Sequence, residues 1–173
     1  MKKIIYIAIA IVASFVMASC EKDPIGGTAV QDMSGEWYVT CDLMTAGGEV
    51  FATGADFFGL DDRFMILTYN TAADKDNELF VDDMENFWAF QCVTSCNLQN
   101  LTFTAADAED LLYGDTVTLS GKIVKNGTTT PSGAAADYIE IDVTFGSDEY
   151  PAEYGYDHYR LSGWRYTGFA NDD

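Results

Sequence analysis

The chain has 173 residues, with 28 acidic and nine basic side chains and a formal net charge of −19 at pH 7. A surface this acidic repels nucleic acid and anionic lipid headgroups, so the charge excludes binding to DNA, to RNA or directly to a membrane surface. Hydrophobic residues make up 48% of the chain, which is enough for the core of one ordinary domain.

Residues 1–19 have the pattern of a secretory signal. Two lysines open the segment, and the apolar run over 4–18 fits a signal-peptide core better than a transmembrane helix, which needs about 20 residues. Small residues Ala18 and Ser19 stand directly before Cys20, so "VMASC" resembles a bacterial lipobox. We expect cleavage before Cys20 and a diacylglycerol on its thiol, with an uncleaved anchor helix as the alternative.

Residues 20–33 are expected to form a lipidated tether. The acidic residues that follow Cys20 in "CEKDP" resemble the signal by which Bacteroides-type bacteria export lipoproteins to the cell surface. The stretch "EKDPIGGTAVQDM" contains proline and two glycines and lacks apolar periodicity, which is typical of a linker. We therefore expect an outer-membrane protein that is held only by its N-terminal lipid. The cell-surface face is preferred, and a periplasm-facing position is the alternative.

Residues 34–173 are predicted to form one β-rich domain. The stretch "GEWYVTCDLM" alternates apolar and polar residues, which predicts a half-buried strand. A single short helix is predicted over 105–114, "AADAEDLLYG". Many strands with tight joints and few helices favour an antiparallel barrel or sandwich, and we predict an all-β, eight-stranded antiparallel barrel with at most one short helix. Further strands are predicted over 49–53, 63–70, 79–81, 87–93, 100–105, 115–124, 138–145 and 156–169.

Two resemblances refine this fold. The stretch "SGEWYV" resembles the Gly-x-Trp signature of lipocalins and other calycins, in which an arginine of the last strand packs across the tryptophan and closes the barrel bottom. This resemblance implies that Trp37 pairs with Arg165, which we prefer to Arg160, although the lipocalin Thr-Asp-Tyr motif is absent. Residues from about 32 to 170 also resemble a Bacteroides-type lipoprotein family labelled lipid-binding putative hydrolases. That resemblance is carried by "SGEWYV", "TYNTA", "ENFWAF" and "SGWRYTGF", and it implies a lipocalin-like barrel.

Five apolar residues are candidates for binding a ligand. Phe57, Phe58 and Leu60 lie in "GADFFGLDD", a segment without clear periodicity that either plugs the core or forms a flap over an open barrel end. Alternation places Trp88 and Phe90 in the barrel interior. The same alternation adds Leu119, Ile139 and Ile141 to the expected interior.

No catalytic constellation is visible. His158 is the only histidine, and its neighbour Asp157 is expected on the opposite face of the strand. The chain contains no Gly-x-Ser-x-Gly elbow. We predict no catalytic residue, no enzymatic activity and no cofactor.

Metal binding is not indicated either. The only C-x3-C pair and a single histidine give no recognised ligand spacing. In "DKDNELFVDDME" the acids follow part of an EF-hand count, but Leu79 stands where glycine is required, so a solvated acidic loop is preferred. Cys41, Cys92 and Cys96 are expected to be small core residues or to form one optional disulfide.

Two functions remain open. The first is a lipid-anchored envelope lipoprotein whose barrel binds a small apolar, lipid-like ligand. The second is an accessory lipoprotein with a filled barrel that acts through its surface, beside an envelope or nutrient-uptake complex. A hydrolase is the least favoured function. Interior volume separates the first two functions, because a closed, packed core would rule out ligand carriage.

Overall fold

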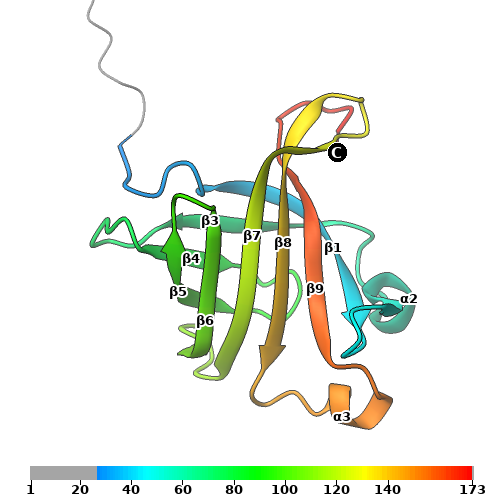
Figure 1. Ribbon diagram of the computed structural model, residues 1–173. Helices are drawn as coiled ribbons and strands as arrows, with labels where there is room; N and C mark the ends of the chain where they lie inside the picture. The colour runs from blue at the N-terminus through cyan, green and yellow to red at the C-terminus, as the bar shows by residue number, and fades with distance from the viewer. Residues whose placement is uncertain (1–26, 173) are drawn as a thin grey trace, which may run out of the picture.

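Alternation of apolar and polar residues builds the strands of this protein, as β1 illustrates. Trp37, Val39, Cys41 and Leu43 are buried, whereas the alternating residues Tyr38, Thr40 and Asp42 are only partly buried on the outer surface. The computed structural model describes residues 27–172, so the expected signal peptide and the lipidation of Cys20 lie outside it. In chain order (Figure 1) the elements are β1 (Gly35–Met44), β2 (Val50–Thr53), α2 (Gly54–Phe58), β3 (Phe64–Asn70), β4 (Glu78–Asp82), β5 (Gln91–Asn97), β6 (Thr102–Glu109), β7 (Thr116–Thr129), β8 (Ala135–Phe145), α3 (Tyr150–Tyr154) and β9 (His158–Arg165).

Strand β1 closes the barrel. From β3 to β9 each strand pairs antiparallel with the next, and β1 pairs with β3 on one edge and with β9 on the other. The short β2 extends the β3 side by pairing with the end of β1. Gly163 lies where β9 meets β1, and a Cβ atom there would overlap the carbonyl group of Tyr38. The predicted all-β, eight-stranded antiparallel barrel is thereby confirmed.

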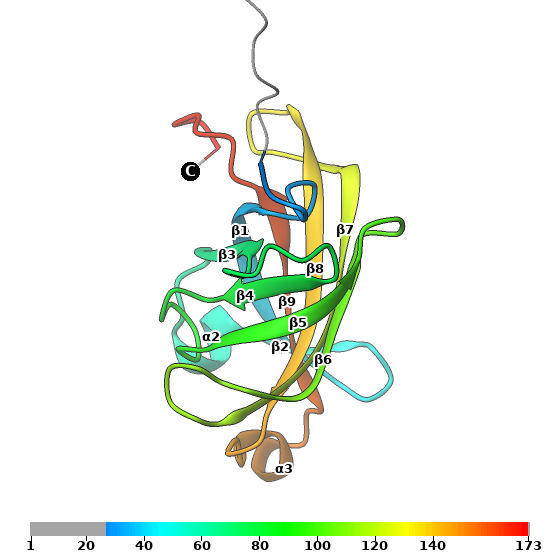
Figure 2. The same ribbon diagram turned by 90° about the vertical axis from the view of Figure 1, so that its left-hand side faces the viewer.

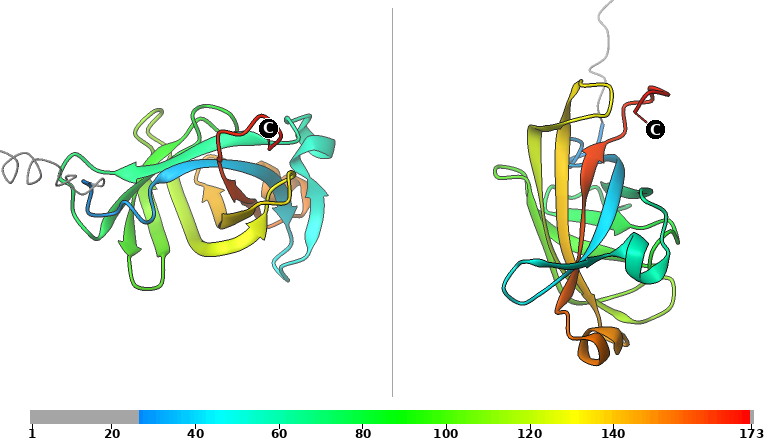
Figure 3. Two further views of the ribbon diagram at one scale, coloured as in Figure 1. Left: turned by 90° about the horizontal axis from the view of Figure 1, so that it is seen from above. Right: turned by 90° about the vertical axis from the view of Figure 1, so that its right-hand side faces the viewer.

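The strands form two crossing walls. Figure 2 shows that β3, β4 and β5 run across the direction of β8 and β9 behind them. Figure 3 places the C-terminal segment and α3 at opposite ends of the molecule. The barrel therefore has two distinct ends, one beside the start of β1 and the C-terminus, the other beside α3.

The interior is filled by side chains. Inward-facing side chains from both walls belong to one buried cluster. The largest of these side chains are each less than 2% exposed. Leu119, Ile139 and Ile141 belong to it, where alternation places them. The largest fully buried side chains are Trp37, Tyr159, Phe90, Phe103, Met33, Leu43, Met44, Ile66, Leu79, Ile139, Ile141 and Leu161.

The helices differ from the prediction. Residues 105–114 are not helical: β6 continues to Glu109 and pairs with β7 across an irregularity between Ala105 and Ala108. The pairing with β7 satisfies this backbone, so it outweighs the local helical pattern. Within residues 27–172, two short helices, α2 and α3, form instead of the one expected. At five residues each, both are too short to show amphipathic periodicity in the sequence.

The packed domain begins before the expected boundary at residue 34. Val30 and Met33 are fully buried and belong to the core cluster. A turn places them there, in which the Ser34 N–H donates to the Val30 carbonyl at 3.0 Å. The segment 28–33 therefore closes one end of the barrel and is not part of a tether. Within residues 27–172, neither helix is long and apolar enough to cross a membrane.

Candidate ligand-binding end

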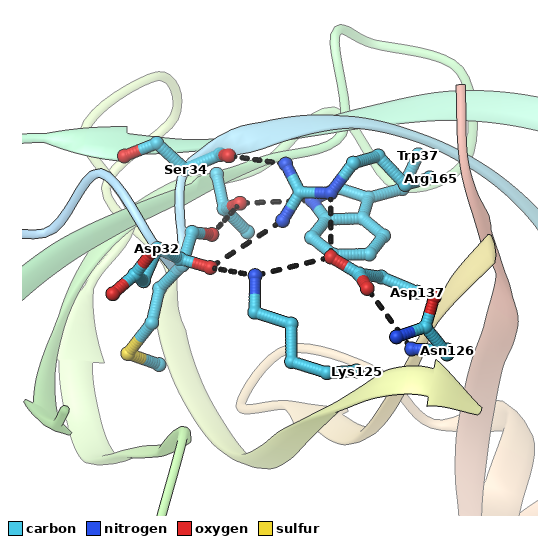
Figure 4. A network of polar contacts seen from close by, with 9 residues as sticks. Asp32, Ser34, Trp37, Lys125, Asn126, Asp137 and Arg165 are labelled. Carbon is cyan, nitrogen blue, oxygen red and sulfur yellow. Dashed lines mark hydrogen bonds and ion pairs between the residues drawn. The ribbon is translucent and has the colours of Figure 1, made fainter. Parts of the chain in front are cut away.

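A polar network closes the end of the barrel beside the start of β1 (Figure 4). The guanidinium carbon of Arg165 lies 4.3 Å from the centre of the Trp37 ring. The same guanidinium donates to the Ser34 carbonyl and, through Nε at 3.1 Å, to Asp137. On the other side, Trp37 Nε1 donates to the Thr68 hydroxyl at 2.8 Å. Both members of the Trp37–Arg165 pair are therefore held by hydrogen bonds as well as by their mutual contact.

Asp137 connects this network to β7. Its carboxylate accepts from Lys125 Nζ at 3.1 Å and from the Asn126 N–H at 3.1 Å. Burial acts to raise the pKa of the Asp137 carboxyl, but the hydrogen bonds from Asn126, Lys125 and Arg165 together hold it below its ordinary value. Lys125 also donates to the Asp32 carbonyl at 2.9 Å. The polar groups of this end bind one another, so we interpret the network as a structural closure of this end of the barrel.

The opposite end is built from aromatic rings, and we call it the aromatic end. The rings come from three segments of the chain that are far apart in sequence, and neighbouring rings contact one another edge-to-face or stacked. Its members are Phe51, Phe57 and Phe58 around α2, Phe87 and Trp88 between β4 and β5, Phe145 at the end of β8, and Tyr150, Tyr154, Tyr156 and Tyr159 around α3 and the start of β9.

The position of α2 follows from its caps and from one close approach. The Thr53 hydroxyl accepts from the Asp56 N–H at the N-terminus, and Gly59 adopts a left-handed conformation that ends the helix. Gly54 lies so near β1 that a Cβ atom there would come within 3.0 Å of the Cβ atom of Cys41. The helix therefore packs directly on the barrel wall, and Phe57 and Phe58 cover the barrel end.

Asp83 positions the rings of the loop between β4 and β5. Its side chain is fully buried, and its two carboxylate oxygens accept hydrogen bonds from the backbone N–H groups of Glu85, Phe87, Trp88, Ala89 and Phe90. These residues form a loop because their N–H groups bind this carboxylate, so the strand expected over 87–93 begins only at Gln91. The sequence does not reveal this role, since nothing distinguishes Asp83 from its acidic neighbours.

The structure brings three of the five candidate residues together. Phe57, Phe58 and Trp88 are half-buried and pack against the core at the aromatic end, where Tyr159 contacts both Phe58 and Trp88. Phe90 is fully buried beneath them, 5.3 Å from the ring of Phe145, and belongs to the packed interior. Leu60 is also half-buried against the core, beside Gly54. The sequence-based reasoning did not select Phe145 or the four tyrosines of this end. The aromatic density of "YPAEYGYDHY" is the signal that could have indicated the tyrosines.

A pocket of about 280 Å³ opens at the aromatic end. Asp148 stands at its inner side, where its carboxylate accepts from the Tyr159 hydroxyl at 2.7 Å and from the Tyr150 N–H at 3.0 Å. Burial raises the pKa of Tyr156 to about 12 and that of Tyr159 still further, so both hydroxyls stay protonated at neutral pH. The pocket is lined by Trp88, Ser147, Asp148, Glu149, Tyr150 and Glu153.

Two other hollows lie on the outer wall of the barrel. One, of about 320 Å³, runs between β1 and α2, where Asp42, Asp56 and Asp61 line it without an aromatic ring. The other, of about 530 Å³, is a shallow apolar depression over β1 and β3 beside Leu67 and Tyr69. Neither is bordered by a candidate ligand-binding residue, and the pocket at the aromatic end is bordered by one of the five, Trp88.

The imidazole of His158 lies between two carboxylates. Nδ1 is 2.9 Å from Asp157, and Nε2 is 3.5 Å from Asp142. The expectation that Asp157 points to the opposite face is wrong, because β9 begins at His158 and Asp157 precedes the strand. Serine-type hydrolysis needs one imidazole nitrogen on a nucleophile, whereas here both nitrogens face acids.

The three cysteines of the described chain are free thiols. Burial, with a smaller contribution from neighbouring acids, raises the pKa of Cys41 and of Cys92 to about 12, so neither is a thiolate at neutral pH. Cys96 is partly buried on β5. Residues 27–172 contain no group of three or more His, Cys, Asp or Glu side chains arranged to hold a metal ion.

Comparison with solved structures finds a Bacteroides ovatus protein of unknown function, known from a crystal structure at 2.40 Å resolution. It is 16% identical to this chain, with a TM-score of 0.42, and the match covers 80% of this chain and 43% of the other. This chain therefore spans less than half of that protein, and the likeness carries no functional argument. Among curated protein sequences, none matches.

The family comparison is decisive by contrast. The family model described as lipid-binding putative hydrolase matches residues 22–170, which is most of the chain. The match includes the barrel, both of its ends and the pocket beside α3. The chain therefore belongs to the lipid-binding putative hydrolase family.

Proposed function

We propose that this protein binds a small apolar, lipid-like ligand at the aromatic end, outside the packed centre of the barrel. One observation carries the proposal: Trp88 and Tyr150 of this end line a pocket and are not fully buried, while the interior beneath them is filled. Phe51, Tyr150 and Tyr154 are 44%, 43% and 46% exposed. A lipid-binding family and a barrel fold are both consistent with an apolar ligand.

The size of the pocket limits the ligand. A volume of about 280 Å³ is just below the range of about 300 to 1,000 Å³ for small-molecule sites, so the pocket holds only part of a lipid-like ligand. Burying five or six methylene groups contributes about 4 to 5 kcal/mol, equivalent to a dissociation constant of about 0.2 to 1 mM. Tight binding therefore requires either ring movement that admits more of the chain, or a polar contribution from the ligand's other end.

The proposal includes lipid anchoring. Cys20 carries the lipid, and the protein resides in the outer membrane facing the cell surface, with the periplasm as the alternative. The lipobox-like "VMASC" and the acids after Cys20 support this location. A Cys20→Ala variant should leave the membrane fraction and should lack the mass of a diacylglycerol. Retention of that mass would refute lipidation at this residue.

The protein acts without catalysis in this proposal. The placement of His158 between Asp157 and Asp142 supports a role other than general base. If a hydrolytic activity were nevertheless measured, a His158→Ala variant that retained it would eliminate the one histidine-dependent mechanism available to the chain.

A second candidate function is favoured by the filled interior. A barrel packed throughout its centre also suits an accessory lipoprotein that acts through its outer surface on an envelope or nutrient-uptake complex. The two candidates differ in where they place the functional residues. The first requires the aromatic end, whereas the second leaves that end as a structural plug.

Tryptophan substitutions test the first candidate directly. The chain from Glu21 to Asp173 contains the whole barrel, and dodecyl maltoside below its critical micelle concentration serves as a neutral single-chain probe for isothermal titration. Trp88→Ala should weaken binding at least about tenfold. The matched control is Trp164→Ala, since Trp164 lies on β9 under Arg63, outside the pocket lining. Equal affinities of the two variants would overturn the proposed site.

Native mass spectrometry tests the same proposal without a chosen probe. If ring movement or a polar contact makes binding tight, the chain purified from cells should carry a stoichiometric apolar molecule that organic extraction releases. A mass without a bound ligand, together with no binding of dodecyl maltoside, would favour the second candidate function over the first.

A further inference from the structure

We infer that the ligand's polar end is cationic, an amine or quaternary ammonium group held at the pocket beside Trp88, Tyr150 and the carboxylates of Glu149 and Glu153. This inference rests on the proposed function and names the chemical class of its ligand. It concerns the headgroup, which contacts the pocket mouth, and leaves the apolar chain among the rings of the aromatic end.

The first argument is the charge of the lining. Three of the six residues around the pocket are acids, Asp148, Glu149 and Glu153, and none is basic. Neither Glu149 nor Glu153 forms an ion pair with a residue of the range 27–172. The six lysines and arginines of that range all have partners elsewhere: Lys75 on Glu78, Lys122 on Glu140, Lys125 and Arg165 on Asp137, Arg160 on Asp142, and Arg63 over the ring of Trp164.

The second argument is the presence of ring faces in the same pocket. Cations bind over aromatic faces within about 6 Å of the ring centre, and tryptophan is the best partner. Trp88 and Tyr150 both line the pocket; Phe145 stacks on one face of Trp88, 4.7 Å between ring centres, and Tyr150 remains 43% exposed. Rings and carboxylates in one pocket lining form the combination that recognises ammonium groups, because both attract positive charge.

The third argument is that the pocket offers little to an anionic headgroup. Backbone N–H groups at the start of a helix are the usual donors to a carboxylate or phosphate. Here the Tyr150 N–H already donates to Asp148, and Pro151 has no N–H. The negative potential of the carboxylates also reaches Tyr154, since the charge of Glu153 is the main cause that raises the pKa of Tyr154. A fatty-acid carboxylate would meet repulsion and find few donors.

Three probes with the same twelve-carbon chain separate the headgroup from the chain. Dodecyltrimethylammonium, dodecyl maltoside and laurate are titrated below their critical micelle concentrations into the chain from Glu21 to Asp173. The cationic probe should bind at least about tenfold more tightly than laurate, with the maltoside between them. Raising the salt concentration should narrow this difference, because the carboxylates of Glu149 and Glu153 are near the surface.

Paired variants locate the effect. Glu149→Gln with Glu153→Gln should bring the cationic probe to the affinity of the maltoside and leave the maltoside unchanged. Glu149 caps α3 without a side-chain hydrogen bond, so its substitution removes no helix cap. The control is Glu36→Gln with Asp76→Asn, which removes the same charge from two acids that do not line the pocket. These control substitutions should leave the preference for dodecyltrimethylammonium over laurate and the maltoside unchanged.

The outcomes separate the inference from the function on which it rests. If the maltoside binds through Trp88 but the three headgroups bind equally, the headgroup inference is wrong and the proposed function stands. The headgroup inference also fails if the control pair weakens cation binding as much as the pocket pair does, because the attraction then comes from the total charge. If no probe binds, or if Trp88→Ala changes nothing, the proposed function itself fails.

Discussion

At the end beside the start of β1, Arg165 contacts the Trp37 ring and donates to Ser34 and Asp137, whereas at the end beside α3 the contacts are mainly between aromatic rings. Hydrogen bonds are directional, and a buried group that loses one is left unsatisfied. Ring contacts tolerate several geometries of similar energy. The first end is thus held in one arrangement, whereas we propose that the half-buried rings of the aromatic end can shift where no hydrogen bond fixes them.

The two tryptophans show the same contrast. Trp37 is fully buried and hydrogen-bonded through Nε1, while Trp88 is half-buried and lines a pocket. Equivalent substitutions at the two residues should therefore differ in kind: loss of Trp37 acts on folding stability, and loss of Trp88 acts on binding. Four substitutions test this division, beginning with the largest expected effect.

Trp37→Ala should lower the free energy of unfolding by about 3 to 5 kcal/mol, as for other buried aromatic residues. The change removes the largest side chain of the core, deprives Arg165 of its ring contact and leaves Thr68 without its donor. Chemical denaturation measures the effect, and Trp37→Phe should recover part of it. An unchanged unfolding midpoint would show that Trp37 does not stabilise the fold, and the proposed difference between the two ends would then be wrong.

Asp83→Ala should lower the free energy of unfolding by about 2 to 4 kcal/mol, because five backbone N–H groups lose their acceptor and loop opening allows water to satisfy some of them. The emission of Trp88 should move toward that of a solvated indole. Asp83→Asn keeps one acceptor oxygen, so its free energy of unfolding should lie between those of the wild type and Asp83→Ala. Wild-type stability in Asp83→Ala would show that this loop is not a scaffold for the rings.

Trp88→Ala should lower the free energy of unfolding by only about 1 to 2 kcal/mol, because the ring is half-buried and lacks a buried hydrogen bond. Calorimetric melting gives this number alongside the binding titration described above. A loss as large as that of Trp37→Ala would mean that the aromatic end is a second structural closure, and the contrast would fail.

Asp137→Asn should cost about 1 kcal/mol at pH 7 through weaker contacts with Lys125, Asn126 and Arg165. The pKa of Asp137 is lower in the folded state than in the unfolded chain, where an aspartate titrates near about 3.9. Its stabilisation is therefore present above that pH and is lost as the pH falls through the folded value. Melting curves of variant and wild type should converge below about pH 4. A constant gap down to pH 2 would contradict the role of this carboxylate.

Local alternation made the strands predictable. The strand expected over residues 35–44 coincides with β1, because a two-residue period with one buried face is encoded within the strand itself. The same alternation placed Leu119, Ile139 and Ile141 in the core. The helix over 105–114 failed for the opposite reason, since the partner strand β7, which no local pattern reveals, decided the conformation of that segment.

The sequence by itself determined the strand content, the fold class and, through its motifs, the family. Only the tertiary structure decided how the ends are closed. Arg165 and Ser34 are 131 residues apart, and the rings of the aromatic end come from three separated segments. The role of Asp83 likewise emerges only when its loop folds around it. A residue's own neighbours fix strand periodicity, whereas barrel ends are assembled from segments that meet only after the barrel has closed.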